Sequence, residues 1–274
     1  MVENSYVKDQ DRVEDLGRRR FLELFLTLPL AIGINKIHLP EIATPESIAD
    51  PEFFKDIIAD QRDDKEYAGM TRKVNHYNTC GEATLATIEN MLNKQDGVKV
   101  PNKIIADTFK ALDGKTFTNE WGQPFPYFDK YELTPVEVLP SAIDILMPQF
   151  NLETKFLTPL PFWSTKDEKM EWHPIPLANW SYYLLKAQDI CKDGGFTIVV
   201  GEKNGWPHIM LATNVKSDGT ATFVDTYTGT AKKAVFSDFL EVVGGQPALL
   251  AILGITHLPN IQNQNFNRQP FNQF

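Results

Sequence analysis

The spacing of apolar residues changes near residue 196, from a helical period before it to a strand-like period after it. Between residues 80 and 92, small and apolar residues occupy most of the helical surface, which predicts a buried helix that ends in the sequence KQDG. Three further helices are predicted, at 100–114, at 134–146 and at 180–195. The intervening residues 157–179 carry many prolines and aromatic residues and predict a loop.

The runs FTIVVG, PHIMLATNV and TATFVDTY lie between residues 196 and 227 and are rich in β-branched and aromatic residues, which predicts three strands. The sequence SDGT at 217–220 predicts a hairpin turn between the last two. Because helices come first and an antiparallel sheet follows, the predicted class is α+β.

Composition narrows the range of functions. Hydrophobic residues make up 42% of the 274 residues, which is enough to bury a core without disulfide bonds. The net charge of -9 argues against a nucleic-acid partner, since such domains usually carry a basic patch. The two cysteines, Cys80 and Cys191, cannot form a disulfide framework, although one bridge between them is an alternative. Cys191 lies in an apolar helical run and is expected in the core.

The first 45 residues have the character of an export signal. Three arginines at 18–20 precede a short apolar run at 21–34, which is the usual order of regions in such signals. The stretch resembles a bacterial twin-arginine (Tat) signal, but Gly17 replaces the usual Ser or Thr and Glu23 replaces a frequent Lys. The resemblance implies export, and residues 18–34 would tether the chain to a membrane if they are not removed. An amphipathic helix packed on the domain is the alternative.

The rest of the chain divides by composition into three parts. Residues 46–74 are highly charged and predict an arm or a pro-segment. Residues 75–257 contain the predicted helices and strands and form the main domain. Residues 258–274 are rich in Asn and Gln without a helical or strand period, so we expect a disordered tail.

A cysteine at the start of a helix points to nucleophilic chemistry. Cys80 begins the predicted helix at 80–92, where the helix dipole favours a thiolate, and Gly81 beside it is expected to leave room for a substrate backbone. A nucleophile of this kind needs a base, and five histidines are candidates: His38, His76, His173, His208 and His257.

His208 is the favoured base because it opens a strand after the turn-like KNGW. Asp225 follows 17 residues later on the predicted partner strand, where antiparallel pairing can bring it beside His208 to fix the imidazole tautomer. His208 as an ordinary strand histidine, and Asp225 as a residue that begins the turn before Gly229, are the alternatives. A buried structural role is the alternative for Cys80.

The motifs CGEATLATI, GWPHIMLATNV and TATFVDTYTG resemble those of the C39-like branch of the papain-like cysteine peptidases. The family usually has Pro where this chain has Glu82, Gly before the histidine where it has Pro207, and Pro after the aspartate where it has Thr226. The family also has an oxyanion-binding Gln six residues before the cysteine, where this chain has Val74. Asn75 is the candidate replacement, and Asn78 is its rival.

The resemblance implies a papain-like fold and a catalytic triad of Cys80, His208 and Asp225 that hydrolyses peptide or protein substrates. It implies no cofactor and no metal. Three alternatives stay open: a transamidase or acyltransferase on the same triad, a non-catalytic papain-like binding domain, and a zinc site that adds His76 to the three triad residues. The sequence gives no indication of an oligomeric state.

Overall fold

A computed structural model describes residues 47–70, 79–118, 124–126, 134–159, 164–166, 169–171, 174–203, 206–243 and 246–257. The predicted export signal, the candidate Asn75 with its rival Asn78, and the predicted Asn/Gln-rich tail lie outside these residues.

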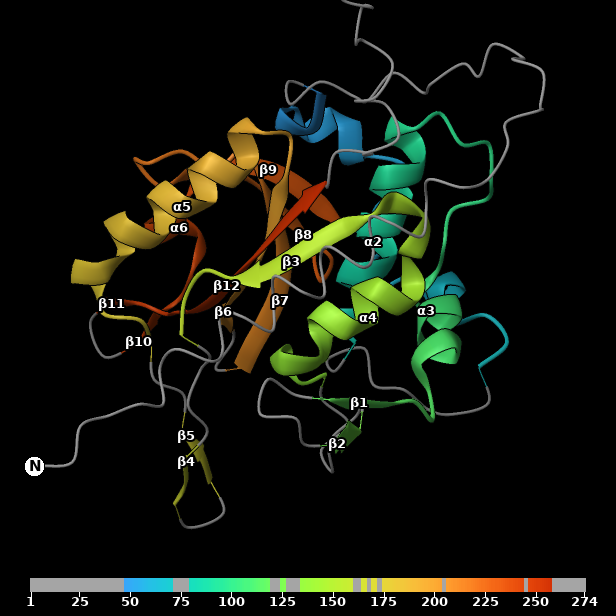
Figure 1. Cartoon of the computed structure of the whole chain (residues 1–274), viewed down its shortest axis with the longest axis horizontal. Helices are drawn as coiled ribbons and strands as arrows, with labels where there is room; N and C mark the ends of the chain where they lie inside the picture. The colour runs from blue at the N-terminus through green and yellow to red at the C-terminus, as the bar shows by residue number, and fades with distance from the viewer. Residues whose placement is uncertain are drawn as a thin grey trace, which may run out of the picture. The chain divides into compact units, whose positions relative to one another are not determined.

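A six-stranded sheet forms the centre of the described structure (Figure 1). Its spatial order is β3-β12-β6-β7-β8-β9, and every neighbouring pair is antiparallel. The strands are β3 (Leu152–Phe156), β6 (Phe196–Lys203), β7 (Trp206–Thr213), β8 (Thr220–Asp225), β9 (Thr230–Val235) and β12 (Leu249–His257). The long apolar strands β6, β7 and β12 lie inside the sheet, as expected for strands buried on both faces.

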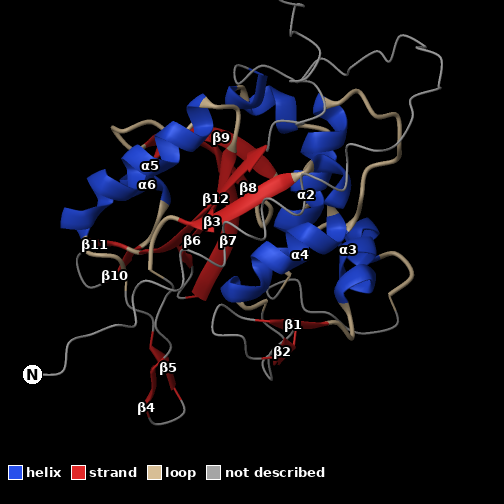
Figure 2. Cartoon of the chain, in the orientation of Figure 1, coloured by secondary structure: helices blue, strands red, loops and turns tan. Residues whose placement is uncertain are grey.

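Helices cover both faces of this sheet, with α2, α3 and α4 on one side and α5 on the other (Figure 2). The helices are α2 (Cys80–Gln95), α3 (Ile105–Leu112), α4 (Leu139–Leu146), α5 (Trp180–Lys192) and α6 (Phe236–Phe239). Short 3-10 helices are η1 (Ser47–Ala49), η2 (Pro51–Phe54), η3 (Asp64–Tyr67), η4 (Val136–Val138), η5 (Pro148–Phe150) and η6 (Leu177–Asn179). Small hairpins pair β1 (Thr116–Thr118) with β2 (Pro124–Pro126), β4 (Ser164–Lys166) with β5 (Lys169–Glu171), and β10 (Val242–Val243) with β11 (Gln246–Pro247).

The alternation of side chains along each strand divides the interior into two hydrophobic cores. On β7, Ile209 and Leu211 pack into the core that contains α2 and α4, whereas Met210 and Ala212 pack into the core that contains α5 and α6. The same period of two holds in β6, so each central strand contributes to both cores. This anchoring makes the middle of the sheet a rigid support for residues at its strand ends.

The segment 47–70 packs against the domain through buried apolar residues and hydrogen bonds. Ile48, Phe54 and Ile57 belong to the same core as α2. The side chains of Thr213 on β7 and Thr222 on β8 donate to backbone carbonyls of η1. We call residues 47–70 the strap, because they run from the sheet to α2.

The predicted α+β class is confirmed, since a helix that starts at Cys80 packs on a C-terminal antiparallel sheet. The helix predicted at 100–114 is shorter, since α3 begins at Ile105. The Asn90 side chain explains the late start, because it bonds the N–H and the carbonyl of Lys103 and holds that residue in a loop. Among the described residues, no helix combines the length and the apolar character needed to cross a bilayer.

Candidate active site

Cys80 occupies the first position of α2 and is 8% exposed. The residue before it, Thr79, stands at the N-cap but makes no side-chain capping bond, because its hydroxyl bonds the Tyr67 hydroxyl at 2.8 Å. The first N–H groups of a helix lack partners within the helix, and its dipole is positive at this end. Cys80 therefore lies where a thiolate, or an oxyanion formed beside it, is stabilised.

His208 and Asp225 form a buried pair at the ends of two neighbouring strands. His208 Nε2 lies 2.9 Å from Asp225 Oδ1, and the two side chains are 9% and 3% exposed. The same carboxylate oxygen accepts the backbone N–H of Tyr227 at 3.0 Å, while the Tyr227 ring meets the imidazole edge-on with centroids 6.2 Å apart. These contacts fix both the position of the carboxylate and the plane of the imidazole.

The Cys80 thiol lies near the His208 imidazole and contributes to the raised pKa of that ring. Because Nε2 of the imidazole faces Asp225, Nδ1 is the nitrogen left to face the sulfur. In the neutral ring, a proton on Nε2 donated to Asp225 leaves Nδ1 as an acceptor for the thiol proton. The structure thus brings together all three residues that the sequence nominated, in the order thiol, imidazole and carboxylate.

The electrostatics of the site favour a charged imidazole. Burial by itself lowers the pKa of His208, but the hydrogen bonds to Asp225 and Cys80 and the charges of both partners outweigh it. Together they raise the pKa of His208 from 6.5 to about 9. A histidine whose pKa is raised beside a carboxylate can hold the proton that general acid catalysis requires.

The other cysteine and the other described histidine lie elsewhere. Both thiols are free, so the alternative of a bridge between Cys80 and Cys191 is not realised. Cys191 lies on the buried side of α5 and packs into the core, as predicted, and burial raises the pKa of its thiol to about 11. His257 ends β12, where burial lowers its pKa and its electrostatic neighbour is Asp96 at the far end of α2.

Gly81 has a different role from the predicted one. A Cβ at this position would lie 2.7 Å from three side-chain atoms of Thr134, so the space beside Gly81 is filled by that side chain rather than left for a substrate backbone. Thr134 also donates a hydrogen bond of 2.8 Å to the buried carboxylate of Glu82. The residue pair Gly81-Glu82 therefore docks the start of α2 against the segment that leads to α4. The sequence offers no signal for Thr134, which lies 53 residues from Gly81.

Two predicted features lie outside the described residues. Asn75, the candidate oxyanion donor, and His76, the extra ligand of the zinc alternative, belong to the undescribed range 71–78. Within the described ranges, no group of three or more His, Cys, Asp or Glu side chains is arranged to hold a metal ion.

Among the described residues, Trp206 is the exposed large apolar side chain nearest to His208 along the chain. It begins β7, is 68% exposed and precedes His208 by two residues, a spacing that directs both side chains to the same face of a strand. Its exposure leaves Trp206 accessible to a substrate.

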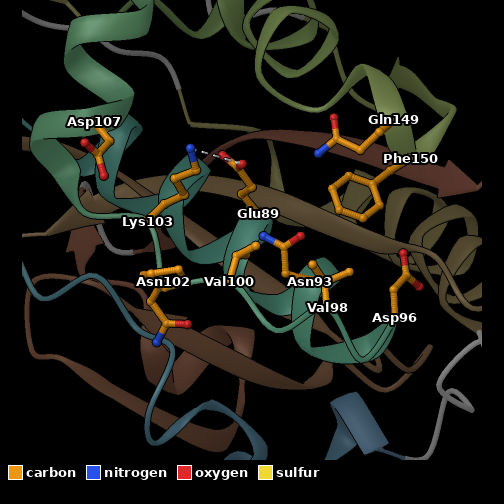
Figure 3. Close-up of a pocket in the computed structure, with 11 residues that line it drawn as sticks. Glu89, Asn93, Asp96, Val98, Val100, Asn102, Lys103, Asp107, Gln149 and Phe150 are labelled. Carbon is orange, nitrogen blue, oxygen red and sulfur yellow. Dashed lines mark ion pairs between the residues drawn. The ribbon is translucent and has the colours of Figure 1, made fainter.

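A cavity of about 600 Å³ is lined by Glu89 and Asn93 of α2 and by the segment that follows the helix (Figure 3). Glu89 and Lys103 form an ion pair of 3.9 Å in its wall, and Phe150 and Gln149 close another side. Glu89 follows Cys80 by nine residues, which is about 13 Å along the helix axis and half a turn around it. This cavity is therefore separate from the Cys80–His208–Asp225 site.

A scan against protein-family models finds no match, and a search of curated proteins finds none either. Among solved structures, the chain is similar to the peptidase domain of Streptococcus ComA, described as a bifunctional ABC transporter involved in a quorum-sensing pathway. The TM-score is 0.36 and 15% of residues are identical, over 68% of this chain and 95% of that one. The case for a function therefore comes from the arrangement of Cys80, His208 and Asp225.

Proposed function

We propose that this chain is a cysteine peptidase of the C39-like, papain-like type, which hydrolyses peptide or amide bonds through Cys80, His208 and Asp225. The observation that carries the proposal is the buried relay itself. A thiol at a helix start lies near an imidazole, and Nε2 of that imidazole lies 2.9 Å from a buried carboxylate oxygen. A nucleophile, a base and a group that orients the base are the parts that acyl transfer needs.

In the proposed reaction, each of these groups has a defined step. His208 Nδ1 takes the proton of the Cys80 thiol, and the thiolate sulfur attacks the carbonyl carbon of the substrate. The imidazolium then gives that proton to the leaving amine nitrogen as the carbon–nitrogen bond breaks, which leaves a thioester on Cys80. Water gives a proton to His208 as its oxygen attacks the thioester carbon. The carbon–sulfur bond then breaks, the carboxylic acid product departs, and the Cys80 sulfur takes the proton back from His208.

Asp225 supports both steps without exchanging a proton. Its carboxylate accepts the Nε2 proton of His208 and stabilises the imidazolium that forms after each proton transfer. The negative oxygen of the tetrahedral intermediate would be bound by the backbone N–H of Cys80 at the start of α2, with Asn75 as the proposed side-chain donor. Loss of one such donor typically slows acyl transfer by about 100-fold to 1000-fold.

Export through the Tat-like stretch is part of the same proposal. Arginines at 18–20 followed by a short apolar run support it, and export after folding would keep the Cys80 thiol reduced until translocation. Replacement of Arg18 and Arg19 by lysine should retain the protein in the cytoplasm of a bacterial host, as measured by cell fractionation. Unchanged export of the variant would reject this part and leave the chemistry untouched.

The test of the chemistry uses a peptide library, with products identified by mass spectrometry. We expect hydrolysis by the wild type and by Cys191→Ala, the matched control, and none by Cys80→Ala. A mass increase equal to the acyl group of the substrate on Cys80 would identify the thioester.

Added hydroxylamine separates the alternatives. Capture of most acyl groups by the amine, with little hydrolysis, would identify a transamidase. Absence of both product and acyl-enzyme across the library would reject a peptidase and leave a binding domain.

A further inference from the structure

The strap contacts the turn that follows Asp225. The Gln61 backbone N–H donates to the Thr226 carbonyl at 2.9 Å, and the Thr226 hydroxyl donates to Gln61 Oε1 at 2.8 Å. Arg62 donates to the Thr228 carbonyl in the same turn. Gln61 and Thr226 are 1% and 0% exposed, so their two mutual hydrogen bonds are shielded from water.

The same part of the strap contacts the residue before Cys80. The Tyr67 hydroxyl donates to the Gln61 carbonyl at 2.9 Å and lies 2.8 Å from the Thr79 hydroxyl. Because a hydroxyl has a single proton, and that of Tyr67 is used on Gln61, the Thr79 hydroxyl is the donor to Tyr67. The chain of bonds thus runs from Thr226 through Gln61 and Tyr67 to Thr79.

The ends of this chain of bonds are the direct neighbours of two triad residues. Thr226 follows Asp225, and Thr79 precedes Cys80. The pairing of β7 with β8 runs from Leu211 opposite Val224 to Thr213 opposite Thr222, so it stops one residue before Asp225 and three residues from His208. The strap therefore restrains the turn after Asp225, which lies beyond the last paired residues of β7 and β8.

We propose that Gln61 and Tyr67 are positioning residues, which join the turn after Asp225 to the start of α2 and so hold the His208–Asp225 pair in register with Cys80. This inference rests on the proposed function. It also makes the strap an integral part of the active domain rather than a segment to be removed. A displacement of about 1 Å between reacting groups can cost 100-fold in rate, so a bridge of this kind bears directly on catalysis.

The test compares two buried threonines of β8 and its following turn, each of which donates to the strap. Thr226→Val removes the bond to Gln61, and Thr226→Ser keeps it. Thr222→Val is the matched control, because Thr222 is also fully buried and donates to the Ala49 carbonyl at 2.8 Å, but it lies three residues before Asp225. Two readouts need no substrate: the rate of iodoacetamide alkylation of Cys80, located by peptide mapping, and the NMR titration of the His208 imidazole.

We expect Thr226→Val to slow the alkylation of Cys80 by about tenfold or more at pH 7 and to lower the His208 titration midpoint. Thr226→Ser should restore both values, and Thr222→Val should leave both unchanged while lowering the unfolding midpoint. Tyr67→Phe, which keeps the ring, should repeat the effect of Thr226→Val.

Equal behaviour of Thr226→Val and Thr222→Val in both readouts would overturn the inference and leave the strap with a structural role alone. If Thr226→Val does not fold, Tyr67→Phe decides by the same two readouts. Selective effects at Cys80 and His208, in a protein that hydrolyses no peptide, would support the bridge and reject the proposed function. If Thr226→Val and Tyr67→Phe hydrolyse peptides as fast as the wild type, the proposed function is supported and the bridge is rejected.

Discussion

Replacement of Asp225 by asparagine tests the electrostatics of the site most informatively. The side chain keeps its shape and an oxygen that can accept from His208, but it loses the negative charge. That charge and the hydrogen bond to it help raise the pKa of His208 from 6.5 to about 9 against the opposing effect of burial. A shift of this size corresponds to about 3 kcal/mol at 1.36 kcal/mol per pKa unit.

The raised pKa has a defined consequence for stability. Between pH 6.5 and about 9 the folded protein binds a proton at His208 that the unfolded chain releases. The free energy of unfolding therefore falls as pH rises, by about 1.4 kcal/mol per pH unit within this window, and the contribution is fully present below pH 6.5. In Asp225→Asn the pH range over which this stability is lost should narrow, because the pKa of His208 in the folded protein comes closer to 6.5.

Urea unfolding at pH 6 and pH 9.5, together with the NMR titration of His208, measures both effects. We expect Asp225→Asn to lower the pKa of His208 by about one unit or more and to reduce the pH-dependent loss of stability by about 1.4 kcal/mol. Other titrating groups are common to both proteins and cancel in the comparison. Identical His208 titrations and parallel stability curves would refute the reasoning.

Three further predictions concern residues around the site. Gly81→Ala should lower the free energy of unfolding by about 1–3 kcal/mol in urea denaturation, because its Cβ meets Thr134, and a second change of Thr134 to alanine should recover part of that loss. Cys191→Ala should leave the total rate of thiol alkylation unchanged at pH 8, since burial raises the pKa of Cys191 to about 11, whereas a fall in that total rate would show that Cys191 is itself labelled. Glu66 accepts the N–H of Ile105 at the start of α3, and burial raises its pKa from 4.5 to about 7. The free energy of unfolding should therefore fall as pH rises from 4.5 to about 7, and Glu66→Gln should flatten this part of the stability profile. An unchanged profile in the variant would contradict this prediction.

The sequence predicted best the elements in which the pattern of apolar residues reflects the burial of a single helix or strand. The helix at Cys80 and the strands around His208 and Asp225 carry strong apolar periods, and their antiparallel hairpin brings residues 17 apart in sequence into contact. Sequence order and the hairpin turn were therefore sufficient to nominate the His208–Asp225 pair.

Elements that depend on distant contacts were missed. Strand β9 has the sequence TAKKAV, and its lysines Lys232 and Lys233 are exposed. It was missed because an edge strand needs no apolar face and so lacks the pattern that predicts a strand. The charged sequence of the strap does not indicate that Gln61 forms a bridge, because its partner Thr226 lies 165 residues away in the sequence. The same holds for Thr134, whose contact with Gly81 is visible only in the folded chain.

The central claim is that Cys80 and His208 react as a pair. The most direct measurement is the rate of iodoacetamide alkylation at Cys80 across a pH series, for the wild type and for His208→Ala. The account predicts rapid labelling at about pH 6–7, well below the value near 8.5 at which an isolated thiol titrates, and a loss of about tenfold or more in the variant. Slow labelling that rises only above about pH 8 and is equal in both proteins would contradict it and leave Cys80 as a structural cysteine.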